Sequence, residues 1–181
     1  MSEAALRGRL IETARAMNAL GINQGKSGNV SARLEGGFLV TPSGMPYEDL
    51  EPADLVRVGL DGHASGHRDP SSEWRFHRDI YRTRSEAGAV VHTHSAYATT
   101  FACLGRPMTL VIWRAIVAGK HVVILPTLLA FGTQELSDVA LAALAGRKAC
   151  LLAQHGVIAI GTDLADALRR AGVETAVADI R

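Results

Sequence analysis

Apolar residues recur every three or four positions near the start of the chain, at Leu6, Leu10, Ala14 and Met17. This spacing predicts an amphipathic helix, which Ser2 can cap and Gly21 can end. Similar apolar patterns predict further helices over 73–84, 95–104 and 133–145, and a last helix that starts at Asp163. Short apolar or alternating runs predict strands over 29–33, 38–41, 55–60, 89–94, 122–125, 149–153 and 157–160.

The predicted strands and helices follow one another without a regular strand–helix–strand alternation. Glycine-rich turns at 35–37 and 42–44 join neighbouring strands, and 62–70 is expected to be a loop before the helix that Ser71 or Ser72 caps. This order predicts an α/β fold in which helices flank a central, mostly antiparallel or mixed β-sheet. A length of 181 residues fits one domain that spans 1–181.

Composition excludes several classes of protein. A hydrophobic fraction of 48% and a charged fraction of 20% are ordinary for a soluble globular protein, and a net charge of +1 gives no electrostatic case for nucleic acid or acidic membranes. Charged residues and a proline interrupt the most apolar stretch, 108–131, which is therefore a poor membrane span. We expect neither nucleic acid nor a membrane as a partner.

Two features favour a cytoplasmic location. The first twenty residues carry charges that exclude the apolar core of a signal peptide, at Glu3, Arg7, Arg9, Glu12 and Arg15. Cys103 and Cys150 each lie in an apolar stretch and form no C-x-x-C pair, so buried free thiols are expected rather than a disulfide. Free thiols are typical of a reducing compartment.

The most telling segment is Val90-Val91-His92-Thr93-His94. Side chains two apart in a strand point to the same face, so His92 and His94 project together. They could be polar residues on a solvated face, but the two valines indicate a buried strand end, where unpaired imidazoles are costly. Two imidazoles on one face suit zinc or a similar divalent metal.

Two further residues complete a set of four metal ligands. His155 follows a buried apolar run and precedes a glycine, although alone such a residue is more often a hydrogen-bonded core histidine. Glu73 opens a predicted helix, where an acidic residue usually complements the helix dipole. Together with His92 and His94 they match a four-ligand zinc site, one ion per chain, with another divalent ion as the alternative. His77, one helical turn after Glu73, is expected to support the site or to pack.

Three turns offer groups that bind anions. They are the glycine loop 25–29, the turn 41–44, and Ser71-Ser72 at a helix start, where backbone N–H groups and the helix dipole favour negative charge. Each also has a purely structural explanation, because glycines form turns and serines cap helices. The position of Ser71-Ser72 directly before Glu73 favours a phosphate pocket beside the metal.

At these residues the chain resembles the class II aldolase/adducin family, and within it the L-fuculose-phosphate aldolase branch. The matching stretches occur in the family's order over about residues 6–170, and they are 23–31, Thr41-Pro42-Ser43-Gly44, Pro70-Ser71-Ser72-Glu73, Val91-His92-Thr93-His94, Phe131-Gly132-Thr133 and His155-Gly156. The combination is far more specific than any one of the motifs.

The resemblance implies a zinc-dependent aldolase that cleaves the C3–C4 bond of a ketose 1-phosphate, such as L-fuculose 1-phosphate, to dihydroxyacetone phosphate and an aldehyde. It implies zinc bound by Glu73, His92, His94 and His155, with Glu73 also acting as general acid/base, a role that requires its pKa to be raised toward neutrality. It implies phosphate contacts from Gly28, Asn29, Ser43, Gly44, Ser71 and Ser72. A homotetramer with active sites between subunits is implied as well.

The chain departs from the branch where the aldehyde half is expected to bind. Ile112-Trp113 replaces a His-Tyr pair whose tyrosine serves the aldehyde oxygen as a proton donor, and Lys26 replaces a threonine. Other enzymes of the scaffold therefore remain alternatives: a pentulose-phosphate 4-epimerase, a sugar-acid phosphate decarboxylase or a methylthioribulose-phosphate dehydratase. A non-catalytic module like the adducin head is a further alternative. Glutamate rather than aspartate at 73 favours an aldolase over an epimerase, and four retained ligands argue against the module.

Overall fold

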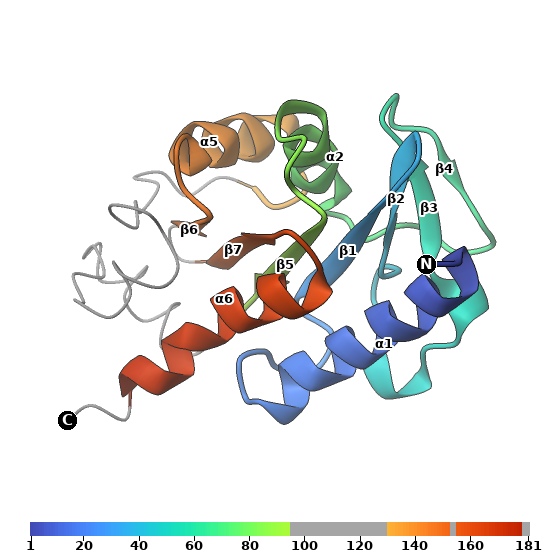
Figure 1. Ribbon diagram of the computed structural model, residues 1–181, viewed down its shortest axis with the longest axis horizontal. Helices are drawn as coiled ribbons and strands as arrows, with labels where there is room; N and C mark the ends of the chain where they lie inside the picture. The colour runs from blue at the N-terminus through green and yellow to red at the C-terminus, as the bar shows by residue number, and fades with distance from the viewer. Residues whose placement is uncertain (95–129, 153–154, 179–181) are drawn as a thin grey trace.

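The computed structural model describes residues 1–94, 130–152 and 155–178 (Figure 1). Within these residues the strands form one sheet in the order β4-β3-β2-β1-β5-β7-β6, and every neighbouring pair is antiparallel. The strands are β1 (Asn29–Leu34), β2 (Gly37–Val40), β3 (Val56–Gly59), β4 (Ala64–Ser65), β5 (Ala89–Thr93), β6 (Ala149–Leu152) and β7 (Gly156–Gly161). The prediction of a helix-flanked, mostly antiparallel sheet is confirmed.

Four helices pack on this sheet in the described part of the chain, and they are α1 (Glu3–Ala19), α2 (Trp74–Thr83), α5 (Gln134–Leu144) and α6 (Leu164–Ala178). Two short 3₁₀ turns, η1 (Tyr47–Asp49) and η2 (Pro52–Asp54), lie between β2 and β3. The predicted helices over 73–84 and 133–145 are confirmed to within one residue. The helix predicted over 95–104, the strand over 122–125 and Cys103 lie outside the described residues.

Two details of the predicted fold are wrong. The segment 62–70, expected to be a loop, contains β4, which pairs Ser65 with Arg57 of β3. Both residues of β4 are exposed, so no apolar pattern marked this edge strand. Neither Ser71 nor Ser72 caps α2: Glu73 stands at the N-cap, and the Ser71 hydroxyl accepts a hydrogen bond from the Glu73 N–H at 3.4 Å.

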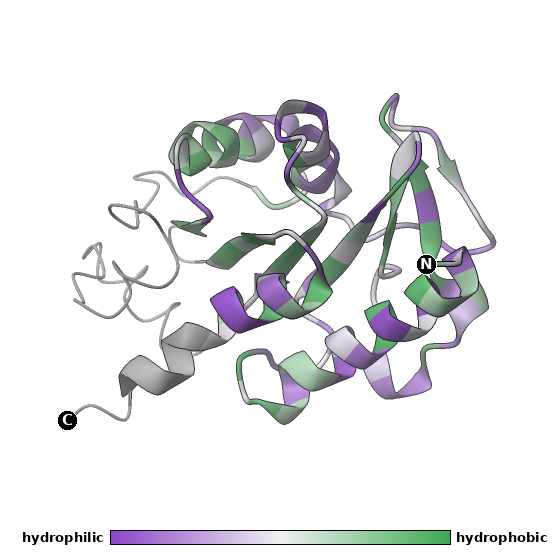
Figure 2. Ribbon diagram, in the orientation of Figure 1, coloured by the Kyte–Doolittle hydropathy of each residue, from purple (hydrophilic) through white to green (hydrophobic). Residues whose placement is uncertain are grey.

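The helices cover both faces of the sheet, α1 and α6 on one side and α2 and α5 on the other (Figure 1). The strand period separates the two cores: Val91 of β5 packs in the cluster with α1 and α6, and its neighbour Val90 packs in the cluster with α2 and α5. Figure 2 shows that β5, β6 and β7 are largely hydrophobic, while hydrophilic residues appear on the helices. Strands buried on both faces lose the polar alternation of a half-exposed sheet.

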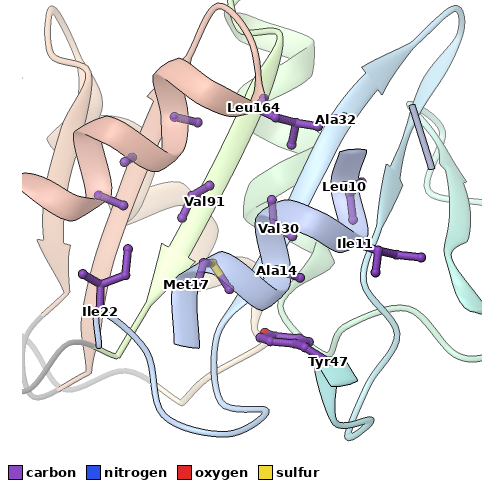
Figure 3. Packing of buried hydrophobic residues seen from close by; sticks show 14 of the residues in the cluster. Leu10, Ile11, Ala14, Met17, Ile22, Val30, Ala32, Tyr47, Val91 and Leu164 are labelled. Atoms are coloured by element: carbon purple, nitrogen blue, oxygen red, sulfur yellow. The ribbon is translucent and has the colours of Figure 1, made fainter. Parts of the chain in front are cut away.

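The first predicted helix uses its apolar stripe as expected. Leu10, Ala14 and Met17 of α1 are fully buried and pack in the cluster that includes Val30 and Val91 (Figure 3). Burial of a side chain the size of Leu or Met stabilises the fold by roughly 1.5–3 kcal/mol relative to exposure. The Ser2 hydroxyl accepts a hydrogen bond from the Ala5 N–H and caps the helix, as predicted.

Cys150 on β6 is a buried free thiol, in agreement with the prediction, and burial raises its pKa to about 12. Among the described helices, none combines the length and the apolar character that a membrane crossing requires.

Candidate metal centre

Four side chains from three separate parts of the chain meet at one end of the central strands. Glu73 stands directly before α2, His92 lies on β5, His94 follows β5, and His155 precedes β7. The antiparallel pairing of β5 with β7 sets Thr93 opposite Val157, so the turn with His155 lies beside the end of β5. One donor atom from each of the four residues lies within 4.8 Å of the other three.

The geometry is that of rings grouped around a common point. The Nε2 atoms of His92 and His94 are 2.9 Å apart, and Glu73 lies 3.2 Å from His92 Nε2 through Oε2 and 3.1 Å from His155 Nε2 through Oε1. The three imidazole planes meet at 76° to 84°. Glu73 and His92 are buried, whereas His94 and His155 are half-buried.

Hydrogen bonding assigns the protons in a way that suits a cation. In the neutral ring of His92, Nδ1 donates to the Val157 carbonyl at 2.8 Å, which leaves the lone pair on Nε2. His94 Nε2 lies 2.9 Å from this lone pair, so either an N–H of His94 or a cation can fill the space between the two nitrogens. Glu73 Oε1 is buried and faces His155 Nε2 at 3.1 Å. The donor set of three imidazoles and one carboxylate therefore fits a divalent metal ion.

The pKa values oppose one sequence-based expectation. Burial raises the pKa of Glu73, but the imidazoles of His92 and His155 lower it more strongly, so the net pKa lies well below its ordinary value. The raised pKa expected for an acid/base role is therefore not found, and Glu73 is ionised. Burial, aided by the charges of His92 and His155, lowers the pKa of His94 to about 3. A neutral imidazole and an ionised carboxylate are the forms that bind a metal.

A line of buried, hydrogen-bonded side chains contacts Glu73 on the side of Oε2. Asn29 Nδ2 donates to Glu73 Oε2 at 2.9 Å, and the Asn29 amide oxygen faces His77 Nε2. His77 is fully buried and contacts Asn29, and whether it supports the site or only packs stays a prediction. Ser31 and Tyr81 extend this line and were missed. The spacing could have identified them, because residues two apart on a strand or four apart on a helix share a face. Asn29 and Ser31 have the first spacing, and His77 and Tyr81 have the second.

The three predicted anion-binding turns lie close to this cluster. Gly28 precedes Asn29, and a Cβ atom there would lie 2.5 Å from the His92 carbonyl oxygen, so only glycine fits. The Ser71 N–H donates to the Thr41 carbonyl at 3.0 Å, and the Ser43 N–H donates to the Asp69 carbonyl at 3.0 Å. These bonds hold the turn 41–44 alongside 69–71, the segment that leads to Glu73.

Exposure divides the six predicted phosphate-binding residues. Ser43, Gly44 and Ser72 are exposed, whereas Gly28, Asn29 and Ser71 are buried. Their contact with a phosphate stays a prediction. Ile112 and Trp113, which mark the departure from the aldolase branch, lie outside the described residues.

Comparison with known proteins agrees with this geometry. The family model of the class II aldolase and adducin N-terminal domain matches residues 8–180. A protein of Rhodospirillum rubrum named 5-methylthioribulose-1-phosphate/5-deoxyribulose-1-phosphate aldolase is 49% identical over 94% of this chain and 77% of its own length. The L-fuculose phosphate aldolase of Escherichia coli K12 is 41% identical over 88% of this chain and 74% of its own length.

Solved structures give the same result. A structure of L-fuculose 1-phosphate aldolase superposes with a TM-score of 0.91 at 33% identity, covering 97% of this chain and 84% of that one. The L-fuculose-1-phosphate aldolase of Thermus thermophilus superposes with a TM-score of 0.81 at 30% identity, covering 94% and 89%. Sequence, fold and site geometry agree, and the chain belongs to the class II aldolase and adducin N-terminal domain family.

Proposed function

We propose that the protein is a metal-dependent aldolase that cleaves the C3–C4 bond of a small ketose 1-phosphate to dihydroxyacetone phosphate and an aldehyde. The observation that carries this proposal is the convergence of three imidazole Nε2 atoms and the ionised Glu73 carboxylate at one end of the sheet. Its histidine-rich donor set favours Zn²⁺ as the ion. A divalent ion held there would offset the negative charge that develops on the substrate oxygens during the reaction.

Glu73 is proposed to move the proton at C3 of dihydroxyacetone phosphate. The lowered pKa, contrary to the raised value expected, keeps Glu73 ionised and able to take this proton in the condensation direction. In the cleavage direction the carboxyl group, a strong donor at this pKa, returns the proton. Asn29 donates to Oε2, and Oε1 faces His155 Nε2 at 3.1 Å. The carboxylate therefore has one oxygen fixed by an amide and one directed at the imidazoles, where the cation or the proton is proposed to bind.

The phosphate group of the substrate is proposed to bind at the turns beside this cluster. The proposed contacts are Gly28, Asn29, Ser43, Gly44, Ser71 and Ser72. Support comes from the hydrogen bonds that join 41–43 to 69–71 next to Glu73, because they bring two predicted anion-binding turns together. Backbone N–H groups and hydroxyls at such turns suit a phosphate.

We propose a substrate whose C5 carries no hydroxyl group, either 5-deoxyribulose 1-phosphate or 5-methylthioribulose 1-phosphate, in preference to L-fuculose 1-phosphate. The R. rubrum relative named for the first two compounds is 49% identical, against 41% for the E. coli relative named for L-fuculose phosphate. Replacement of a His-Tyr pair by Ile112-Trp113 also favours a less polar aldehyde half. A homotetramer with active sites between subunits is proposed from the family resemblance, and a cytoplasmic location is proposed from the free thiol of Cys150.

The test is a comparison of the three ketose 1-phosphates with the Zn²⁺-loaded protein, with dihydroxyacetone phosphate and aldehyde both quantified. We expect equal amounts of the two products, faster cleavage of the two C5-deoxy or methylthio compounds, and no cleavage after chelation. Consumption of the ketose 1-phosphate without release of an aldehyde would indicate a dehydratase or an epimerase and would refute the proposed cleavage. Light scattering of the same sample tests the tetramer.

A further inference from the structure

Five buried side chains form an unbroken line of hydrogen bonds that ends on Glu73. Tyr81 OH lies 2.8 Å from Ser31 Oγ, and Ser31 Oγ lies 2.7 Å from His77 Nδ1. His77 Nε2 lies 2.5 Å from Asn29 Oδ1, and Asn29 Nδ2 lies 2.9 Å from Glu73 Oε2. Every member is buried, with exposed fractions between 0% and 4%.

The chemistry of its last member fixes the direction of the whole line. An ionised carboxylate only accepts hydrogen bonds, so Asn29 must turn its NH₂ group toward Glu73 and its oxygen toward His77. That oxygen also only accepts, so His77 Nε2 must carry the proton. Burial lowers the pKa of His77 to about 3, which makes the ring neutral and leaves Nδ1 as an acceptor for the Ser31 hydroxyl. Tyr81 then donates to Ser31.

Loss of the His77 N–H would release this constraint. The Asn29 amide oxygen would lose its donor in a buried place, which is unfavourable, and a half-turn of the amide would direct that oxygen at the Glu73 carboxylate. His77 is itself fixed, because its ring stacks on Phe76 with a centroid distance of 4.5 Å. The orientation of His77 is therefore transmitted to Glu73 through one amide group.

We propose that His77 is a positioning residue, whose Nε2–H fixes the Asn29 amide and thereby holds the Glu73 carboxylate turned toward the three metal-binding imidazoles. The proposal rests on the proposed role of Glu73 as a metal ligand. It predicts that metal affinity depends on a donor at this position, although His77 has no contact with the ion.

Two substitutions of His77 with side chains of similar volume distinguish a positioning role of this residue from a packing role. His77→Gln can present an amide N–H where Nε2 stands, whereas His77→Leu fills the space without a donor. The measurement is the release of Zn²⁺ from the loaded protein in a chelator titration. We expect His77→Leu to bind Zn²⁺ about 10–100-fold more weakly, the usual cost of removing an outer hydrogen-bond partner of a metal site. His77→Gln should stay close to the parent protein. A role in packing alone predicts the reverse order, since the apolar side chain suits a buried position better.

Nitrogen NMR of the histidine rings gives a readout that needs no variant. We expect the parent protein to show His77 with its proton on Nε2 and with Nδ1 as an acceptor. A proton on Nδ1 would overturn the proposal even if His77→Leu failed to fold. Equal Zn²⁺ release from the Leu and Gln variants, both with the melting temperature of the parent, would overturn it as well. Absence of ketose cleavage by the parent would refute the proposed reaction only, because neither measurement uses a substrate.

Discussion

The stability of the metal-free protein should fall between pH 7 and pH 5 because His77 is buried in its neutral form. Its pKa is lowered from 6.5 to about 3 in the folded chain, with burial as the largest cause. In this pH range the unfolded chain binds a proton at His77 and the folded chain does not. The contribution to stability is therefore complete above pH 6.5 and is lost as pH falls toward 3.

The magnitude follows from the two pKa values. Below pH 6.5 each pH unit shifts the free energy of unfolding by up to about 1.4 kcal/mol per histidine, which amounts to about 2 kcal/mol between pH 7 and pH 5. This value changes little with the folded pKa, provided that it lies well below 5. His77 is fully buried, so solvent screening does not reduce the effect.

The assay is urea unfolding followed by circular dichroism at pH 7 and pH 5, with chelator present and the protein concentration fixed. His77→Gln removes the titrating ring, so its loss of stability over this range should be about 2 kcal/mol smaller than that of the parent. His94, whose pKa is also lowered, contributes to both proteins and cancels in the difference. Tyr81→Phe breaks the same chain but keeps the imidazole, and should follow the parent. Equal pH dependence of the parent and His77→Gln would refute the reasoning.

Three further predictions concern the metal centre itself. Gly156→Ala would press a Cβ atom against the Thr93 carbonyl oxygen, and it should lower the free energy of unfolding in urea by roughly 1–3 kcal/mol. The control is Gly8→Ala, which has open space around it and should stabilise the protein slightly. His94→Ala should leave the purified protein without stoichiometric Zn²⁺ in elemental analysis, because one of four ligands is lost. Glu73→Gln should retain part of the metal and lose about 10²–10⁴-fold in turnover, measured as aldehyde release, and full activity would refute the proton-transfer role.

The sequence predicted the parts of this site that depend on short-range periodicity. The strand period alone placed His92 and His94 on one face, and the valines before them indicated that this face is buried. Glu73 and His155 were weak candidates alone, because their positions depend on which strands become neighbours. The pairing of β5 with β7, which lie far apart in sequence, brings His155 to the end of β5. No local pattern contains that information.

The electrostatics of Glu73 could not be predicted either, because two opposing effects act on it. Burial alone would raise its pKa, in line with the expectation for a general acid. The imidazoles of His92 and His155 reverse the sign, and their distances of about 3 Å are set by tertiary contacts. A sequence identifies the groups that interact, but the sign of the shift depends on which interaction is stronger.

The position of Asn29 explains why the site and the core form one unit. On β1, Val30 points into the cluster under α1 and α6, while its neighbours Asn29 and Ser31 point toward α2. The backbone of β1 therefore places Val30 in the core and at the same time directs the Asn29 amide toward Glu73. A shift of β1 by one residue would exchange the two faces, bury the polar pair in the apolar cluster and turn Val30 toward Glu73. The register that the hydrophobic core requires is thus the register that the metal ligands require.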